Sequence, residues 1–338
     1  MGEQRMNSNP AVSVVIPLLN KASHISRTLD SVCAQTFQDF EIVVVEGGST
    51  DNSPEIVRNF KDPRIRLILQ DKKRPGVSAA RNIGIHEARS EFIAFLDADD
   101  EWRPRFLETI IRLRQRFPDA GLYATSYCLG YRSHTVYPKI RGIPSSPWEG
   151  TLDSYFKVLV VSPVLPFITS SVGIPKPVLT AVGLFNPARR MGEDKELFCK
   201  IAMHYPVAYN TYAGAVYDQT SENKATRNFR KANPLFEEYL AQTPLDDLKL
   251  LPFYDDFYKY CEKCYLTSAY QNIGAGEMKF ARKHLSQVKS KEFLTQRLIL
   301  TMLATLPFSL GRYIVSLRLN LIPYYYSIVS SVENFKMI

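Results

Sequence analysis

The feature that most constrains the fold is a regular alternation of strand-like and helix-like segments over the first 120 residues. Short apolar runs rich in β-branched residues predict strands, and segments with one apolar helical face predict helices. The expected strands are 12–16, 41–45, 65–69 and 92–96, and the expected helices are 22–35, 54–60, 78–88 and 105–117. This strict alternation of strand and helix predicts an α/β fold with a mostly parallel sheet. We also expect Ser78 to cap the third helix.

Length and charge predict two regions. A chain of 338 residues exceeds what one core usually organises, and 45% hydrophobic with 12% aromatic residues indicates a globular protein. We expect an α/β domain over 1–222 and a helical region over 223–338. From Lys224 to Ile338 there are 16 Lys and Arg against 10 Asp and Glu, which supplies +6 of the net charge of +8. The chain has no nucleic-acid-binding signature, so the basic region predicts an anionic substrate or lipid rather than a nucleic-acid partner.

The cysteines and the first residues indicate a reducing compartment. Five cysteines are an odd number, and Cys261 and Cys264 lie three residues apart in a helix-like segment with no second pair. The first ten residues are polar and lack the apolar stretch of a signal peptide. We therefore expect a cytoplasmic protein.

Polar or glycine-rich residues follow three of the expected strands, in segments 17–20, 46–51 and 97–100. Ligands of parallel α/β sheets bind beyond the carboxyl ends of the strands, so these loops predict a nucleotide pocket. Asp97, Asp99 and Asp100 follow a buried strand directly, and such a cluster suits a divalent cation, a cationic partner or a turn held by side-chain caps. Neither GxGxxG nor a Walker lysine motif is found in this region, which argues against ordinary dinucleotide and P-loop sites.

Five motifs occur in an order that resembles the family 2 glycosyltransferases of the GT-A fold. They are 12–20 (VSVVIPLLN), 35–51 (QTFQDFEIVVVEGGSTD), 76–85 (GVSAARNIGI), 92–102 (FIAFLDADDEW) and 192–197 (GEDKEL). The resemblance implies a Rossmann-like, mostly parallel GT-A sheet over 1–222. It also implies inverting transfer of a sugar from a nucleotide-diphosphate sugar to a saccharide or lipid-linked saccharide, with Mn²⁺ or Mg²⁺, in surface polysaccharide or glycolipid assembly.

The same resemblance implies roles for individual residues on the donor side. The residues implied to line the nucleotide are Pro17, Leu19, Asn20, Glu46, Gly48, Asp51, Asp97 and Ala98. Asp99 would coordinate the metal that bridges the diphosphate, and Asp100 would assist it or cap the turn. Arg81 would hold the nucleotide sugar, or form a salt bridge that secures the Asp-rich loop.

On the acceptor side, the resemblance implies that Asp194 is the general base and that Glu193 binds or orients the acceptor. Acidic residues also favour helix N-termini for structural reasons, so this pair alone would not identify a base. The family commonly has Asp-Asp-Gly where this chain has Glu46-Gly47-Gly48, and the second Asp often reads uracil. A uridine diphosphate sugar is therefore the favoured donor, with guanosine and thymidine diphosphate sugars left open.

The C-terminal region leaves two interpretations open. Residues 298–317 are mostly apolar but include Pro307, Gly311 and Arg312, and basic residues flank them. They predict either peripheral contact with an anionic membrane surface or a buried helical pair. Two other functions are also considered: a catalytically silent sugar- or nucleotide-binding scaffold, and, less favoured, a sugar nucleotidyltransferase.

Overall fold

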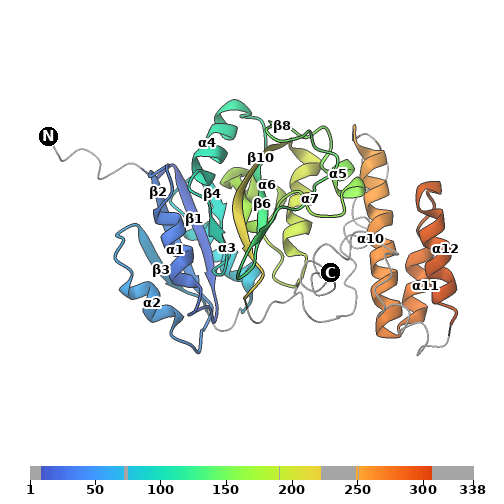
Figure 1. Ribbon diagram of the computed structural model, residues 1–338, viewed down its shortest axis with the longest axis horizontal. Helices are drawn as coiled ribbons and strands as arrows, with labels where there is room; N and C mark the ends of the chain where they lie inside the picture. The colour runs from blue at the N-terminus through green and yellow to red at the C-terminus, as the bar shows by residue number, and fades with distance from the viewer. Residues whose placement is uncertain (1–8, 72–74, 190, 222–248, 250, 307–338) are drawn as a thin grey trace. The chain divides into compact units, whose positions relative to one another are not determined.

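The computed structural model describes residues 9–71, 75–189, 191–221, 249 and 251–306 (Figure 1). The chain divides into two compact units. The sheet unit consists of Met1–Pro138, Pro144–Asp153 and Phe167–Ser221, and the helical unit consists of Lys139–Ile143, Ser154–Pro166 and Glu222–Ile338.

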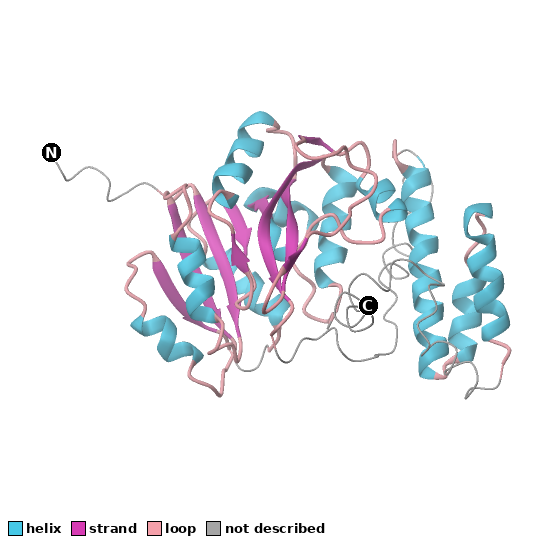
Figure 2. Ribbon diagram, in the orientation of Figure 1, coloured by secondary structure: helices cyan, strands magenta, loops and turns pink. Residues whose placement is uncertain are grey.

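The sheet unit is built on one open sheet of ten strands (Figure 2). The strands are β1 Val12–Leu18, β2 Phe40–Glu46, β3 Ile65–Leu69, β4 Phe92–Phe95, β5 Glu101–Trp102, β6 Leu122–Gly130, β7 Thr135–Val136, β8 Glu149–Thr151, β9 Val172–Pro175 and β10 Val207–Asp218. Their order is β3-β2-β1-β4-β9-β6-β10-β5, with β7 paired to β6 and β8 paired to β10. The predicted α/β class is therefore confirmed.

The sheet is parallel where the sequence alternates regularly and mixed elsewhere. Strands β3, β2, β1 and β4 are parallel to one another, and Val15 of β1 lies between Val43 of β2 and Phe95 of β4. Strand β9 runs antiparallel to both β4 and β6, whereas β6 and β10 are parallel. Strand β9 therefore departs from the parallel pattern expected from the first 120 residues.

Helices cover both faces of the parallel part of the sheet. They are α1 Ile25–Cys33, α2 Ser53–Asn59, α3 Val77–Glu87 and α4 Phe106–Arg116, followed later in the unit by α6 Lys176–Val182 and α7 Glu193–His204. Successive side chains of a strand point to opposite faces. Accordingly, Ile42 and Val44 belong to the core that includes α1 and α4, whereas Val43 and Val45 pack with Ala80 of α3.

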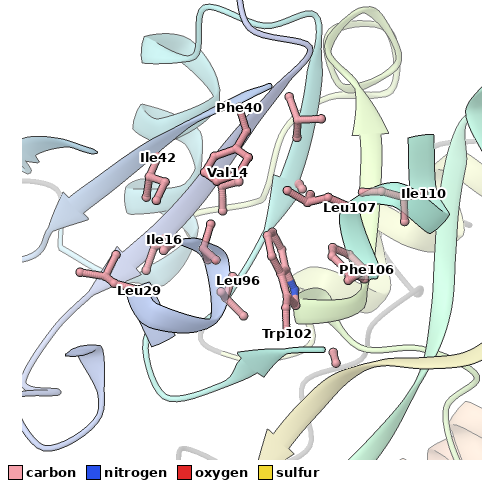
Figure 3. Close-up of a cluster of buried hydrophobic side chains, with 14 of the residues drawn as sticks. Val14, Ile16, Leu29, Phe40, Ile42, Leu96, Trp102, Phe106, Leu107 and Ile110 are labelled. Carbon is pink, nitrogen blue, oxygen red and sulfur yellow. The ribbon is translucent and has the colours of Figure 1, made fainter. Parts of the chain in front are cut away.

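The larger core lies on the α1 and α4 side of the sheet. In Figure 3 the Trp102 side chain lies between those of Leu96, directly after β4, and Phe106, and the ring centroids of Trp102 and Phe106 are 4.4 Å apart. The Trp102 indole Nε1–H donates to the carbonyl of Ser170 at 2.6 Å, which satisfies its one polar atom. Leu96 and Trp102, which flank the Asp-rich segment, both belong to this core, so the core fixes that segment at its two ends.

The start of α3 corrects one expectation. The helix begins at Val77 and its N-cap is Gly76, whose φ of 115° favours glycine. Ser78 lies inside the helix, and its buried hydroxyl has no hydrogen-bond partner among the residues that the structure describes, so the predicted Ser78 cap is wrong. Further along α3, a Cβ on Gly84 would lie 2.3 Å from Val15 Cγ1, so a glycine permits the close approach of α3 to β1.

The helical unit has its own apolar core. Within the described residues, its helices are α5 Tyr155–Val161, α10 Tyr254–Ala275, α11 Met278–Ser286 and α12 Leu294–Leu303. Phe156 of α5 packs against Phe257 of α10, with ring centroids 4.9 Å apart. The Lys263 ammonium of α10 donates to the carbonyls of Leu159 and Val160 at 2.8 Å each, and this caps the end of α5.

The apolar segment 298–317 lies only partly within the described residues. Leu300 and Leu303 of α12 are buried, whereas Leu298 and Met302 are exposed, and residues from 307 onward lie outside the described part. Among the helices that the structure describes, none is both long enough and apolar enough to cross a bilayer.

Candidate active site

The predicted loops meet at one edge of the sheet because β1, β2 and β4 are adjacent and parallel. The loop after β1 is hydrogen-bonded to the loop after β2. The Asn20 side chain accepts the N–H of Thr50 at 2.8 Å, and Asp51 accepts the N–H of Ala22 at 3.0 Å. Asn20 has a φ of 52°, a left-handed conformation that asparagine tolerates better than most residues. These contacts fix the two loops to each other.

The glycine turn after β2 is held by the Glu46 carboxylate. Glu46 Oε1 accepts the N–H of Gly48 at 2.8 Å and also that of Ser49. A Cβ at Gly47 would lie 3.1 Å from Gln70 Oε1, so the Gln70 amide lies beside the position where the family pattern has an aspartate. Sequence reasoning did not single out Gln70, since it lies beyond β3 and has no motif of its own.

The nucleotide-side residues differ in accessibility. Leu19 is exposed and Pro17 is half-buried at the end of β1. Ala98 is buried in the core, and its carbonyl accepts a hydrogen bond from Thr28 Oγ1 at 3.0 Å. Asp97 is half-buried and faces Arg81.

Each aspartate of the Asp-rich segment has a different partner. Asp97 Oδ1 accepts from Arg81 Nη2 at 2.7 Å, and Asp99 Oδ2 lies 2.6 Å from Lys21 Nζ. Asp100 is almost fully buried; it accepts the Ser170 hydroxyl at 2.5 Å and the N–H of Asp218 at 3.0 Å. Three neighbouring carboxylates are thus held by three separate sets of donors.

Asp100 joins the ends of β4 and β10. Burial raises its pKa well above the ordinary value, and the neighbouring charges of Asp99 and Asp97 raise it further. Ser170 lies just before β9 and Asp218 ends β10, so these contacts connect the end of β4 to strands that are far from it in sequence.

Arg81 connects the Asp-rich segment to the start of α7. Its guanidinium is almost fully buried, and Nη1 donates to Glu193 Oε1 at 2.9 Å while Nη2 donates to Asp97. Burial alone would lower the pKa of Arg81, but Asp97 and Glu193 raise it above the ordinary value, so this cation keeps its charge. The salt bridge to the Asp-rich loop, one of the two roles considered for Arg81, is present.

Glu193 and Asp194 begin α7 after Gly192, whose φ is 77°. Burial raises the pKa of Glu193, Asp194 raises it further, and Arg81 lowers it. Asp194 is half-buried; its Oδ1 accepts the N–H of Lys195 at 2.7 Å, and its Oδ2 accepts the Thr169 hydroxyl at 3.3 Å. Asp194 is therefore the carboxylate of this pair that is not engaged by Arg81.

A cluster of basic side chains at the start of α1 completes the edge of the site. Besides Lys21, Arg27 forms an ion pair with Asp218, and His24 Nε2 lies 3.4 Å from the same carboxylate. Burial would raise the pKa of Asp218, but hydrogen bonds from Thr220 and Arg27 lower it below the ordinary value. Sequence reasoning missed this cluster, although a lysine directly after Asn20 at the ligand-binding edge was an available signal.

The donor set suits a metal that arrives with phosphate oxygens. In the part of the chain that the structure describes, no three His, Cys, Asp or Glu side chains are arranged to hold a metal ion. Mg²⁺ is usually bound by one or two carboxylates together with substrate phosphates and waters. Asp99, with its partly exposed carboxylate at the sheet edge, fits that kind of site.

Sequence comparison identifies relatives of the N-terminal part of the chain. Residues 13–163 match the family model described as Glycosyl transferase family 2. The chain is 40% identical over 110 residues to the uncharacterized glycosyltransferase YibD of Escherichia coli K12, which covers 32% of this chain and 31% of that protein. It is 29% identical over 220 residues to a validoxylamine A glucosyltransferase of Streptomyces hygroscopicus, covering 58% and 52%. The chain thus spans about a third to a half of the length of these two relatives.

Solved structures share the fold at low identity. TarS 1–349 of Staphylococcus aureus in complex with UDP-GlcNAc aligns with a TM-score of 0.60 and 15% identity, over 95% of this chain and 91% of that chain. A mannosyltransferase of Pyrobaculum calidifontis, PcManGT, in complex with GDP-Man and Mn²⁺ aligns with a TM-score of 0.57 and 19% identity, over 97% and 88%.

Proposed function

We propose that the chain transfers a sugar from a nucleotide-diphosphate sugar to a saccharide or lipid-linked saccharide acceptor, in keeping with the match of residues 13–163 to glycosyl transferase family 2. The observation that carries this proposal is the Arg81 bridge. It brings Asp97, on the donor side, and Glu193, beside the expected base, into contact with one side chain at distances of 2.7 and 2.9 Å. Residues that lie about a hundred positions apart thus form one assembly.

We assign the proton transfer to Asp194. In an inverting displacement, a carboxylate takes the proton of the acceptor hydroxyl as that oxygen attacks the anomeric carbon. Glu193 is held by Arg81, whereas the Asp194 oxygens accept, within the described residues, a neighbouring N–H and a long hydrogen bond from Thr169. Glu193 then positions the start of α7, and Asp194 acts on the acceptor.

Asp99 is the residue that would hold Mn²⁺ or Mg²⁺. Such an ion would stabilise the negative charge that develops on the departing diphosphate. The structure of PcManGT was solved with GDP-Man and Mn²⁺, which supports a divalent metal for this fold. The role of the chain is to fix Asp99 at the sheet edge, which the hydrogen bonds of Asp100 to Ser170 and Asp218 accomplish from the neighbouring position.

A uridine diphosphate sugar remains the favoured donor. The base would lie over the glycine turn, where Gly47 offers no side chain and the Gln70 amide is adjacent. An amide presents one donor and one acceptor, which matches the N3–H and O4 edge of uracil. The N1–H and O6 edge of guanine has the same pattern, so guanosine diphosphate sugars are also candidate donors.

We also propose that the helical unit contacts an anionic membrane surface, which would suit a lipid-linked acceptor. Leu294, Leu298 and Met302 follow one another every four residues on α12 and are 43, 53 and 69% exposed. Between Met278 and Leu303 there are six Lys and Arg and one Glu. An apolar stripe with a basic surround is the composition of interfacial helices.

Vesicle sedimentation tests the membrane contact. The protein is expected to sediment with phosphatidylglycerol-containing vesicles and not with phosphatidylcholine vesicles. Replacing the three apolar residues of the α12 stripe by serine should abolish the binding. Equal sedimentation of the variant and the wild type would contradict the proposal.

Calorimetric binding of UDP, GDP and dTDP, each with Mn²⁺ and with EDTA, tests the donor site. We expect one nucleotide to bind only with metal, and Asp99→Ala to abolish that binding. Incubation with the matching sugar nucleotide and an acceptor panel should then give a product of inverted anomeric configuration. If no nucleotide binds, the chain retains the fold without the activity, and a scaffold role becomes the better interpretation.

A further inference from the structure

Lys21 holds the carboxylate that the proposed function assigns to the metal. Its Nζ lies 2.6 Å from Asp99 Oδ2 and 2.8 Å from Ser221 Oγ. The two side chains are 19 and 16% exposed, so the pair is neither fully solvated nor sealed. Whatever binds Asp99 from solution must compete with an ammonium group already in contact with it.

Hydrogen bonds fix the backbone of Lys21, and this places its side chain beside Asp99. The Lys21 N–H donates to Ser53 Oγ at 2.8 Å, and its carbonyl accepts the N–H groups of His24 and Ile25 at 2.9 Å each. The flexible four-carbon stem of lysine still allows the ammonium itself to move. A rigid main chain with a mobile charge is suited to exchange between two anionic partners.

We propose that Lys21 is an internal counter-ion of Asp99 that a divalent cation displaces, and that the displaced ammonium then binds the donor diphosphate. This inference rests on the proposed function. The other carboxylates nearby are already engaged. Asp97 contacts Arg81, Asp218 contacts Arg27 and His24, and the buried Asp100 accepts hydrogen bonds from Ser170 and the Asp218 N–H. An incoming diphosphate is therefore the anion that can receive the released ammonium.

The exchange makes metal and nucleotide binding interdependent. A metal ion alone must break the Lys21–Asp99 pair without compensation, so its affinity for the nucleotide-free protein is low. A nucleotide diphosphate supplies a new partner for Lys21 and further oxygen ligands for the metal. Each ligand therefore raises the affinity for the other by the same factor.

Substitution of Lys21 by methionine separates the two effects because they have opposite signs. Titration of Mn²⁺ alone, followed by electron paramagnetic resonance, should show about fivefold tighter binding to Lys21→Met, the size expected for removal of a partly exposed ion pair. The affinity for UDP or GDP in the presence of Mn²⁺ should fall about tenfold, since a charge-assisted phosphate contact is lost. Lys21→Arg, which keeps the charge, should change both affinities less.

Lys200→Met is the matched control. The Lys200 ammonium lies 2.7 Å from Glu196 and the side chain is 23% exposed, so the same chemical change is made to a similar pair on α7. This variant should bind Mn²⁺ and nucleotide as the wild type does. Circular dichroism of Lys21→Met and Lys21→Arg checks that both are folded.

The outcomes distinguish the inference from the function it rests on. If the wild type binds nucleotide with Mn²⁺ but Lys21→Met shows unchanged Mn²⁺ affinity, including undetectable binding in both, the inference is overturned and the donor site stands. Weaker Mn²⁺ binding to Lys21→Met overturns it equally. If the wild type binds no nucleotide, both the proposed function and the inference are overturned.

Discussion

The buried Arg81 bridge gives the strongest single prediction about stability. The change Arg81→Met keeps an unbranched apolar stem but removes the guanidinium, which leaves Glu193 and Asp97 without their shared cation. Removal of one member of a buried charge pair typically costs about 3–5 kcal/mol. Asp97 is 32% exposed and water will solvate part of its charge, so we expect the lower end, about 3 kcal/mol in the free energy of unfolding.

The loss should depend on pH in a defined direction. Burial raises the pKa of Glu193, Asp194 raises it further, and Arg81 opposes both effects. Without Arg81 the folded-state pKa of Glu193 rises again. For an acid with a raised folded-state pKa, stability is present at low pH and is lost as pH rises through that pKa. The destabilisation should therefore be small in acid and grow toward neutral pH.

Urea unfolding at pH 5 and pH 8, followed by circular dichroism, measures both effects. Arg58→Met is the control, because Arg58 forms an exposed ion pair with Glu55 and should change the unfolding free energy by about 0.5 kcal/mol or less. Glu193→Gln combined with Arg81→Met should recover part of the loss by removing the stranded charge. A loss for Arg81→Met no larger than that of Arg58→Met, or one independent of pH, would refute the reasoning.

Three further predictions concern packing, catalysis and thiol reactivity. Gly84→Ala should destabilise the protein by about 1–3 kcal/mol in urea unfolding, because its Cβ would lie 2.3 Å from Val15 Cγ1. The double variant with Val15→Ala should lose less unfolding free energy than the sum of the two single changes. Asp194→Asn should lower kcat by about 10²- to 10⁴-fold in a transfer assay while calorimetry shows unchanged donor affinity; a large loss of donor affinity would contradict its role as base. Burial and the adjacent Asp62 raise the pKa of Cys33 to about 12. Asp62→Asn should therefore lower that pKa and speed the labelling of Cys33 by a thiol reagent at pH 8, measured by mass spectrometry. An unchanged labelling rate would contradict the contribution of Asp62.

The parts of the fold that sequence predicts are those set by short-range periodicity. The first four expected strands and the four helices between and after them are present because apolar spacing and turn residues act within about fifteen positions. Their adjacency also places segments 17–20, 46–51 and 97–100 at one edge. Strand β9 shows the limit: its antiparallel pairing with β4 and β6 depends on partners about fifty to eighty residues away, and no local pattern encodes that direction.

The partners of the site residues could not be predicted for the same reason. Sequence motifs indicate that Asp97, Asp99 and Asp100 matter, but Arg81, Lys21 and Ser170 meet them only after the sheet has formed. The prediction that Ser78 caps α3 was wrong for a different reason. A serine near a helix start favours capping, but Gly76 has the positive φ that ends the preceding loop, and the helix therefore starts one residue earlier than expected.

The partners also decide which aspartate of the cluster is available to a ligand. Asp97 is tied to an almost fully buried arginine that has a second carboxylate to satisfy, so withdrawing it would strand charge in the interior. Asp100 is buried and its two oxygens hold separate elements together. Asp99 alone among the three is paired with a partly exposed lysine on a flexible stem, whose release leaves a charge that water and an anionic ligand can solvate. The cost of freeing each carboxylate, rather than its place in a motif, is what favours Asp99 as the metal ligand.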